Sequence, residues 1–259
     1  MPNIPMKAKG AMDRNSLLSV NAQKIQGAFR SDNIETINTR PLPDTPAVQS
    51  YPERTTASPG PPLSSGNALS RQVVPSLVHP VQKGQKLLLG TTASLQKIRA
   101  CLGWNANDPR CDVDVSAFLL GDNGKVPGDS WFVFYGQTES PDGSTAFAVD
   151  GGTDREFIRV DLARLDPAVK RIVFVLTINE AFEKRLHFGM MQDAYLRILD
   201  ETDRSELVSF KLTDYYSNVI SMMIGEIYRH NDSWKFNAVG NGLAKDLAGL
   251  CEWYGVQVV

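Results

Sequence analysis

The chain has 259 residues, of which 42% are hydrophobic and 22% charged, and its formal net charge is −2 at pH 7. These proportions exclude a collagen, a coiled coil and a fully disordered chain. No apolar run approaches the ~20 residues of a membrane span, no signal-peptide core follows the first methionine, and the three scattered cysteines exclude a disulfide framework, so we expect a cytoplasmic protein.

The first 80 residues differ in composition from the rest of the chain. They hold 11 of the 15 prolines, and residues 31–71 are rich in Ser, Thr, Asn and Gly but almost lack aromatic side chains. Such a segment buries too little apolar area to offset its chain entropy, which predicts a disordered tail over residues 1–80. The tail carries a net charge of +3, which is too small to indicate a nucleic-acid partner.

One stretch of the tail, residues 16–30, has helical periodicity. Its apolar positions recur at spacings of four, three and four residues behind the N-cap candidate Ser16. Two interpretations remain open: a transient helix without a role, or a docking segment that folds on a protein partner, on the domain or on an anionic surface. The apolar positions are Leu18, Ala22, Ile25 and Phe29.

Residues 81–259 have the pattern of short β-strands. Most of these runs are 5–9 residues long, rich in Val, Ile, Phe, Tyr and Trp, and separated by turn signals such as Asp122-Asn123-Gly124. Little helix separates them, so we expect a mainly β fold, an antiparallel β-sandwich. The predicted strands are Lys86–Leu89, Leu95–Trp104, Asp112–Leu120, Trp131–Gln137, Phe157–Leu162, Ile172–Ile178, Tyr195–Leu199, Leu207–Leu212, Ile220–Tyr228 and Trp234–Val239.

Two further features complete the predicted domain. The run Ile172–Ile178 is apolar nearly throughout, which predicts a central strand that is buried on both faces. The apolar spacing from Leu243 to Tyr254 predicts one C-terminal amphipathic helix, which Gly255 ends as its C-cap. A final short strand, Val256–Val259, is a possible addition.

The known catalytic templates are missing. The chain has three histidines and no serine-hydrolase, zinc-protease or phosphate-loop motif. His187 is interpreted as a surface or packing residue, so we expect no enzymatic activity.

Acidic residues indicate a different chemistry. Asp112 and Asp114 alternate with Val113 and Val115, which in a strand places both carboxylates on one face and both valines on the other. Further acids follow in loops that a sandwich brings together at one end. Oxygen-only ligands on such loops suit a hard cation such as Ca²⁺, and the alternative is a solvated acidic rim. The further acids are Asp108, Asp122, Asp129, Glu139, Asp142, Asp150, Asp154 and Glu156.

Seven segments of this part of the chain follow one another in the order of a known family. They are Leu102–Trp104, Cys111–Leu120, Gly124–Val126, Phe132–Tyr135, Ser140–Ser144, Gly225–Arg229 and Trp234–Gly242. These segments resemble the TerD family of tellurite-resistance and stress proteins. The resemblance covers about residues 81–258 and implies a calcium-binding β-sandwich with a role in resistance to tellurite, other toxic stress, phage or colicins. It implies no established enzymatic activity.

The resemblance also implies a ligand set. Asp112 and Asp114 match the Asp-x-Asp of the family's calcium region, and Asp129 and Asp142 match acids in the next two loops. Asn105 stands where the family usually has Asp, and the family's long acidic loop is shortened to residues 150–156 and gains Arg155. We therefore expect weak calcium binding or a single site. The implied metal ligands are Asp112, Asp114, Asp129, Asp142, Asp150, Asp154 and Glu156.

The sequence thus predicts a non-enzymatic, calcium-binding adaptor of a bacterial tellurite- or stress-resistance system, with protein partners that dock through residues 16–30. Two alternatives remain open. One is a calcium-dependent module that binds peripherally at the inner membrane face, where the metal bridges carboxylates and anionic lipid headgroups. The other is a degenerate scaffold that no longer binds calcium.

Overall fold

The computed structural model describes residues 71–150 and 152–258, and the structural statements below concern these residues. The predicted helix at 16–30 and almost all of the predicted tail lie outside them, as does Val259. Residues 256–258 follow the C-terminal helix without forming a strand of either sheet.

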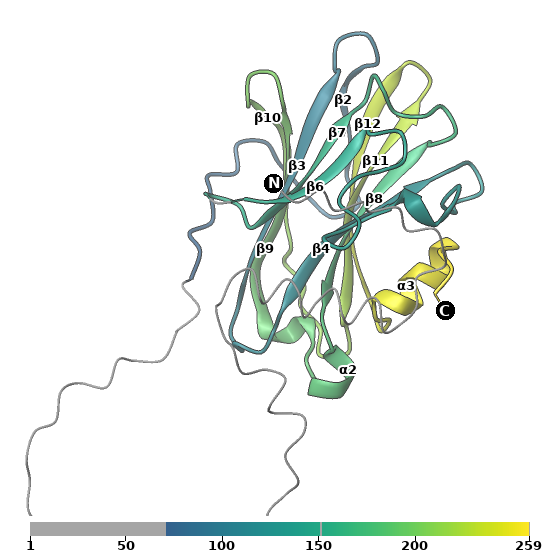
Figure 1. Cartoon of the computed structure of the whole chain (residues 1–259). Coiled ribbons are helices and arrows are strands. Elements are labelled where there is room, and N and C mark those ends of the chain that lie inside the picture. Colours follow the sequence, from purple (N-terminus) through teal and green to yellow (C-terminus); the bar gives the residue numbers. More distant parts are fainter. Residues whose placement is uncertain (1–70, 151, 259) are drawn as a thin grey trace, which may run out of the picture.

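Within the described residues, two six-stranded sheets pack face to face, as the predicted mainly β sandwich requires (Figure 1). Neighbouring strands are antiparallel except for β1, which runs parallel to β10. The first sheet has the order β1 (Pro80–Val81), β10 (Glu206–Lys211), β9 (Met191–Asp200), β3 (Lys97–Ala106), β7 (Glu156–Asp161), β6 (Thr145–Val149). The second has the order β2 (Lys86–Thr91), β12 (Ser233–Leu243), β11 (Ser221–His230), β8 (Arg171–Ile178), β4 (Val113–Leu120), β5 (Phe132–Val133).

The second sheet is covered on both faces. Alternate residues of its strands, such as Ile172 and Phe174 of β8, fill the core between the sheets. The intervening Val173 and Val175 point outward and pack under the C-terminal helix α3 (Leu247–Tyr254), next to Leu250. This double cover explains why residues 172–178 are apolar nearly throughout, and it confirms the predicted central strand.

Several boundaries differ from the predicted ones. The predicted strand Trp131–Gln137 is wrong in extent, because Asp129–Trp131 forms the 3-10 turn η1 and only Phe132–Val133 pairs with β4. Helix α3 begins four residues later than predicted, because Leu243 is still paired in β12 and Asp246 is the N-cap. The sequence pattern did not predict β1, β6 or two short turns of helix, α2 (Ala181–Lys184) and η2 (Phe188–Met190).

Residues 71–81, here called the N-terminal strap, lie along the first sheet. The backbone N–H of Gln72 donates to the side-chain oxygen of Asn105 at 2.8 Å, and the Asn105 amide nitrogen donates back to the Gln72 carbonyl at 3.0 Å. Further along, Glu206 accepts hydrogen bonds from the backbone N–H groups of Val78 and His79, both at 2.8 Å. The strap ends as β1, so it adds a strand to the edge of this sheet.

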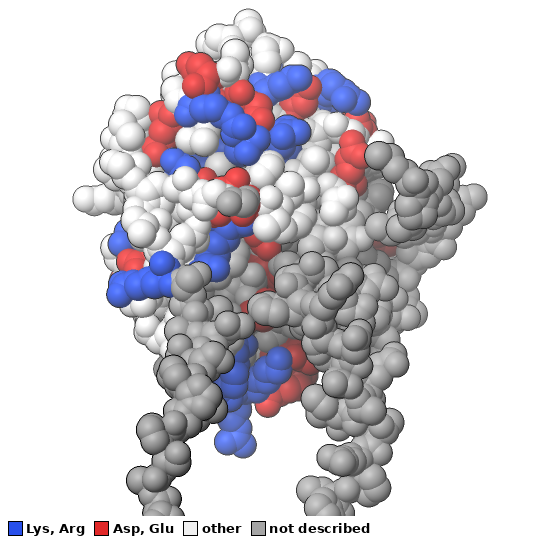
Figure 2. All heavy atoms as spheres, turned by 60° about the vertical axis from the view of Figure 1, so that its left-hand side comes forward, with Lys and Arg blue, Asp and Glu red and all other residues white. Residues whose placement is uncertain are grey.

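The outer face of the first sheet carries charges of both signs. In Figure 2 the basic and acidic side chains lie intermixed on the face shown. Glu201 is the centre of one such network, with Arg99 at 2.9 Å, Arg159 at 3.3 Å and Arg204 at 3.8 Å. The guanidinium of Arg99 also lies 4.0 Å from the ring centroid of Phe157, so this surface is held by ion pairs and a cation–π contact.

Candidate functional site

Strand β4 begins at Val113, one residue later than predicted, so Asp114 of the acidic motif lies in the strand and Asp112 precedes it. Val113 and Val115 point into the core between the sheets. Asp114 and Ser116 lie on the opposite face, and Asp114 is 7% exposed. Thr177 of β8 is the register partner of Asp114, so these side chains lie next to each other.

The charges of three predicted ligands act on one side chain, that of Tyr135. Burial raises the pKa of the Tyr135 hydroxyl, and the negative charges of Asp114, Asp112 and Glu156 raise it further. The carboxylate of Glu156 accepts a 2.8 Å hydrogen bond from the backbone N–H of Val115 in β4. This N–H is not used by β5, whose pairing with β4 begins at Ala117. Glu156 therefore lies at the edge of β4, and Asp112 and Asp114 lie near enough for their charges to reach the same tyrosine.

Asp154, another predicted ligand, is bound by Arg197 and Tyr195. It is 5% exposed and accepts hydrogen bonds from Arg197 at 2.7 and 3.0 Å and from the Tyr195 hydroxyl at 2.9 Å. Because Arg197 bonds to both carboxylate oxygens, neither oxygen is left without a hydrogen bond. The pair lies beside Cys101, at the outer face of the first sheet.

The remaining three predicted ligands each accept a hydrogen bond from at least one backbone N–H group. Asp142 accepts from the Ser140 hydroxyl and from two backbone N–H groups, those of Ser144 and Asp166; these bonds outweigh burial and lower the pKa of its carboxyl. Asp129 accepts from the backbone N–H of Gln257, and Asp150 from that of Asp154. Within residues 71–150 and 152–258, no group of three or more His, Cys, Asp or Glu side chains is arranged to hold a metal ion as it stands.

Both departures from the family pattern have a structural use. Asn105 is 3% exposed, and its amide bonds to Gln72 of the strap and, at 3.2 Å, to Asp193. Arg155 donates a 2.6 Å hydrogen bond to the Trp104 carbonyl, and burial lowers the pKa of its guanidinium, which the negative charge of Glu156 partly offsets. A resident cation therefore lies near one of the three gathered carboxylates.

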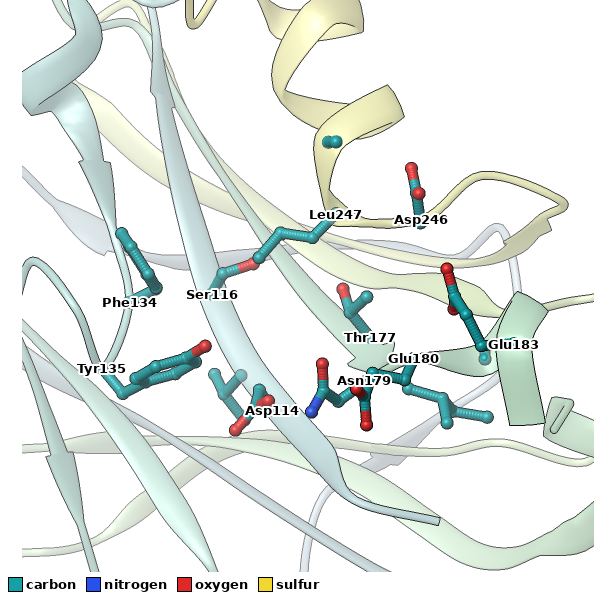
Figure 3. Close-up of a pocket in the computed structure, with 14 residues that line it drawn as sticks. Asp114, Ser116, Phe134, Tyr135, Thr177, Asn179, Glu180, Glu183, Asp246 and Leu247 are labelled. Atoms are coloured by element: carbon teal, nitrogen blue, oxygen red, sulfur yellow. The ribbon is translucent and has the colours of Figure 1, made fainter. Parts of the chain in front are cut away.

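A pocket of about 100 Å³ lies on the outer face of β4 and β8, beneath the first turn of α3 (Figure 3). Of its polar lining residues, only Asp114 was predicted as a site residue. A further signal in the sequence is Asp246, which precedes an apolar helical run and, as the N-cap of α3, accepts a 2.8 Å hydrogen bond from the Gly249 N–H. The polar lining residues are Asp114, Ser116, Tyr135, Thr177, Asn179, Glu180, Glu183 and Asp246.

The thiols lie inside the protein. Cys101, Cys111 and Cys251 are all free and buried. Burial raises the pKa of Cys101, and it raises that of Cys251 to about 12. Cys101 contacts Phe157 and Leu199 in a small apolar cluster, as expected for a packing residue.

Comparisons with known proteins agree with the sequence motifs. A model of the TerD domain family matches residues 77–254. Tellurium resistance protein TerD from Serratia marcescens and its namesake from an Alcaligenes species are each 38% identical over 186 residues, 68% of this chain and 97% of each relative. General stress protein 16U of Bacillus subtilis is 36% identical over 186 residues, again 68% of this chain and 96% of the relative. Among the described residues, no helix is long and apolar enough to cross a membrane.

Proposed function

Because this chain belongs to the TerD family, we propose that it is a non-enzymatic, calcium-binding adaptor of a tellurite- and stress-resistance system. The relatives named for tellurium resistance and for general stress support the biological role. The failure of every catalytic template in the sequence supports a binding role over an enzymatic one.

The gathering of Asp112, Asp114 and Glu156 around Tyr135 carries the calcium part of the proposal. Carboxylate oxygens are the ligands that Ca²⁺ takes, and like charges crowded at one edge are relieved when a cation neutralises them. The donor set fits this ion, although the side chains must approach one another to hold it. Asp129, Asp142, Asp150 and Asp154 contribute less, because their hydrogen bonds hold them at other places in the fold and their charges are not among those that act on Tyr135.

The short loop at residues 150–156 favours a single ion. Asp154 is paired with Arg197, and Arg155 brings a positive charge near Glu156. A second divalent cation would therefore meet a resident guanidinium instead of a carboxylate. We propose weak binding of one Ca²⁺ by a cytoplasmic protein whose partners are other proteins of the resistance system.

Thermal melts test the calcium proposal. We expect Ca²⁺ to raise the melting temperature of the full chain, and Mg²⁺ to raise it less, because Mg²⁺ demands a tighter octahedral site. At about 100 times its Kd, a ligand adds about 2.7 kcal/mol to the free energy of unfolding, which a melt detects. Calorimetric titration should give about one ion per chain; identical melts in EDTA and in millimolar-range Ca²⁺ would refute the proposal.

A further inference from the structure

The pocket beneath α3 contains two buried hydroxyl groups that lack partners. Ser116 and Thr177 are 3% and 5% exposed, and among the described residues neither hydroxyl has a hydrogen-bond partner. Both residues line the pocket and extend from β4 and β8 into the space under Leu247 (Figure 3). Buried polar groups are nearly always paired, because an unpaired one keeps its full desolvation cost. A ligand with polar hydrogens would remove that cost.

The charge around these hydroxyls favours a cation. Asp114, Glu180, Glu183 and Asp246 line the pocket, and its described lining includes no lysine, arginine or histidine. These carboxylates have neighbours of their own: Glu180 pairs with Lys184, and Asp246 caps α3. The described lining nevertheless holds four acidic side chains and no basic one, so the charge at the wall of the pocket is negative.

The backbone at the rim is held in an unusual conformation. Glu180 has a φ of 50°, in the left-handed region that costs a residue with a side chain of order 1 kcal/mol or more. It stands between β8 and α2 as the N-cap of that short helix. This conformation keeps Asn179, Glu180 and Glu183 in one wall of the pocket.

The size and the apolar wall of the pocket fit a larger cation than a metal ion. Its volume of about 100 Å³ is several times that needed by one water molecule. Its four carboxylates come from β4, the turn before α2, α2 itself and the N-cap of α3, so the polar groups lie around the volume on separate elements. Phe134, Ile178 and Leu247 supply apolar surface alongside them.

We propose that this pocket binds a primary ammonium group on an aliphatic chain, either a free alkylamine or the lysine side chain of a protein. An ammonium has three N–H donors and no acceptor, so it can donate to the hydroxyls of Ser116 and Thr177 and to a carboxylate at once. Its methylenes lie against Phe134 and Leu247. The proposal goes beyond calcium binding and does not rest on it; Asp114 is the residue that the two sites share.

Titration of the full chain with n-butylammonium, in EDTA, tests the proposal. We expect millimolar-range n-butylammonium to raise the melting temperature, while tetramethylammonium, which has no N–H donor, leaves it unchanged at equal ionic strength. The double variant Ser116→Ala/Thr177→Val should bind n-butylammonium about tenfold more weakly or worse, because it loses two hydrogen bonds to a charged group. No effect of n-butylammonium, or an equal effect on parent and variant, would overturn the proposal.

The ligand-free stability of the variants gives a second readout. Removing unpaired hydroxyls should raise the melting temperature of the ligand-free double variant by about 2–4 °C, whereas hydroxyls with a structural role would lower it on removal. Ser209→Ala is the matched control, because the Ser209 hydroxyl is also buried and unpartnered among the described residues but does not line the pocket. We expect this control to bind n-butylammonium like the parent; equal weakening would contradict the site.

A short peptide separates the two sources of the ammonium group. If the tripeptide acetyl-Gly-Lys-Gly-amide binds like n-butylammonium and its Nε-acetylated form does not, the pocket takes a protein lysine; if only the free amine binds, it takes a small molecule. Calcium stabilisation is measured on the same variants. If Ca²⁺ stabilises the parent but n-butylammonium does not, the pocket proposal alone is rejected. If n-butylammonium stabilises the parent but Ca²⁺ does not, the calcium proposal alone is rejected.

Discussion

At the scale of single residues, aspartates at different positions of this domain have two different roles. Asp154 and Asp142 are acceptors for Arg197 and for backbone N–H groups, and so they stabilise the fold. Asp112 and Asp114 lie beside Glu156 near the Tyr135 hydroxyl, where their charges add. The difference comes from the neighbours of each carboxylate and not from its local sequence.

Replacing Asp112 and Asp114 by neutral residues should abolish stabilisation by Ca²⁺ without destabilising the metal-free protein. We expect Asp112→Asn/Asp114→Asn to remove the Ca²⁺-dependent rise in melting temperature. In EDTA the variant should be at least as stable as the parent, because the repulsion between the two charges is gone. Melts of parent and variant, each with EDTA and with Ca²⁺, check this. An equal loss in both conditions, of about 1–3 kcal/mol, would show that the two acids are structural.

Asp154→Asn is the matched control, since it makes the same chemical change at a predicted ligand that is already paired. The substitution removes the carboxylate charge and leaves the mostly buried Arg197 guanidinium without its bidentate partner. We expect a destabilisation of about 3 kcal/mol or more, equal with EDTA and with Ca²⁺. A loss seen only in the presence of Ca²⁺ would instead make Asp154 a ligand.

At the scale of elements, the N-terminal strap extends the first sheet beyond the strands that the sequence predicts. Asn105 of β3 fixes Gln72 through hydrogen bonds in both directions, and Glu206 fixes the backbone at Val78 and His79. The family match itself begins at residue 77, inside this segment. The strap therefore covers an edge that β10 would otherwise leave unpaired.

Changing Asn105 to the acid usual in the family should release the strap. Asn105→Asp loses the amide protons that reach Gln72 and Asp193, and it places a second carboxylate against Asp193. We expect thermolysin to cut the Leu77–Val78 bond several-fold faster in this variant than in the parent. Mass spectrometry of the fragments measures the rate. Asn107→Asp, at an exposed position two residues later, is the control, and equal cleavage in all three proteins would contradict the role of Asn105.

At the scale of the whole molecule, the described residues form two packed sheets with one apolar core between them and a second under α3, and the outer face of the first sheet is charged. The ion-pair network around Glu201 lies across β3, β7 and the turn after β9. Hydrogen bonding from Arg99 is the main cause that lowers the pKa of the Glu201 carboxyl, and the charges of Arg99, Arg204 and Arg159 lower it further, against an opposing effect of burial. Surface charge thus joins strands that are far apart in the sequence.

This network makes a prediction about acid stability. A carboxyl whose pKa is lowered by folding stabilises the folded state above its unfolded pKa, near 4.5 for Glu201, and loses that contribution as the pH falls through the folded pKa. We expect Glu201→Gln to be about 1 kcal/mol less stable than the parent at pH 7. The difference should shrink as the pH falls below about 4.5.

Urea unfolding of parent and variant between neutral and acidic pH measures this difference. Glu252→Gln, on α3 and outside the network, should follow the parent at each pH. A Glu201→Gln difference that stays constant with pH would contradict an electrostatic cause.

The sequence by itself determined the fold class, the family and most of the strands, because strand alternation and buried apolar runs are local patterns that follow from a period of two. It also placed Asp114 on the face of β4 opposite Val113 and Val115. The sequence did not predict strand β1 or the late start of α3, because these depend on pairing with the distant strands β10 and β11.

Only the tertiary structure decided which acidic side chains lie near one another and which form ion pairs with basic ones. Glu156 joins Asp112 and Asp114 because β7 of one sheet reaches the open edge of β4 in the other, and Asp154 leaves the set because Arg197 lies beneath its loop. The pocket under α3 likewise combines side chains that are distant in sequence, Ser116 and Thr177 with Asp246. Hydrogen bonding and charge act through space, so loop composition indicates how many ligands are available but not which of them already have partners.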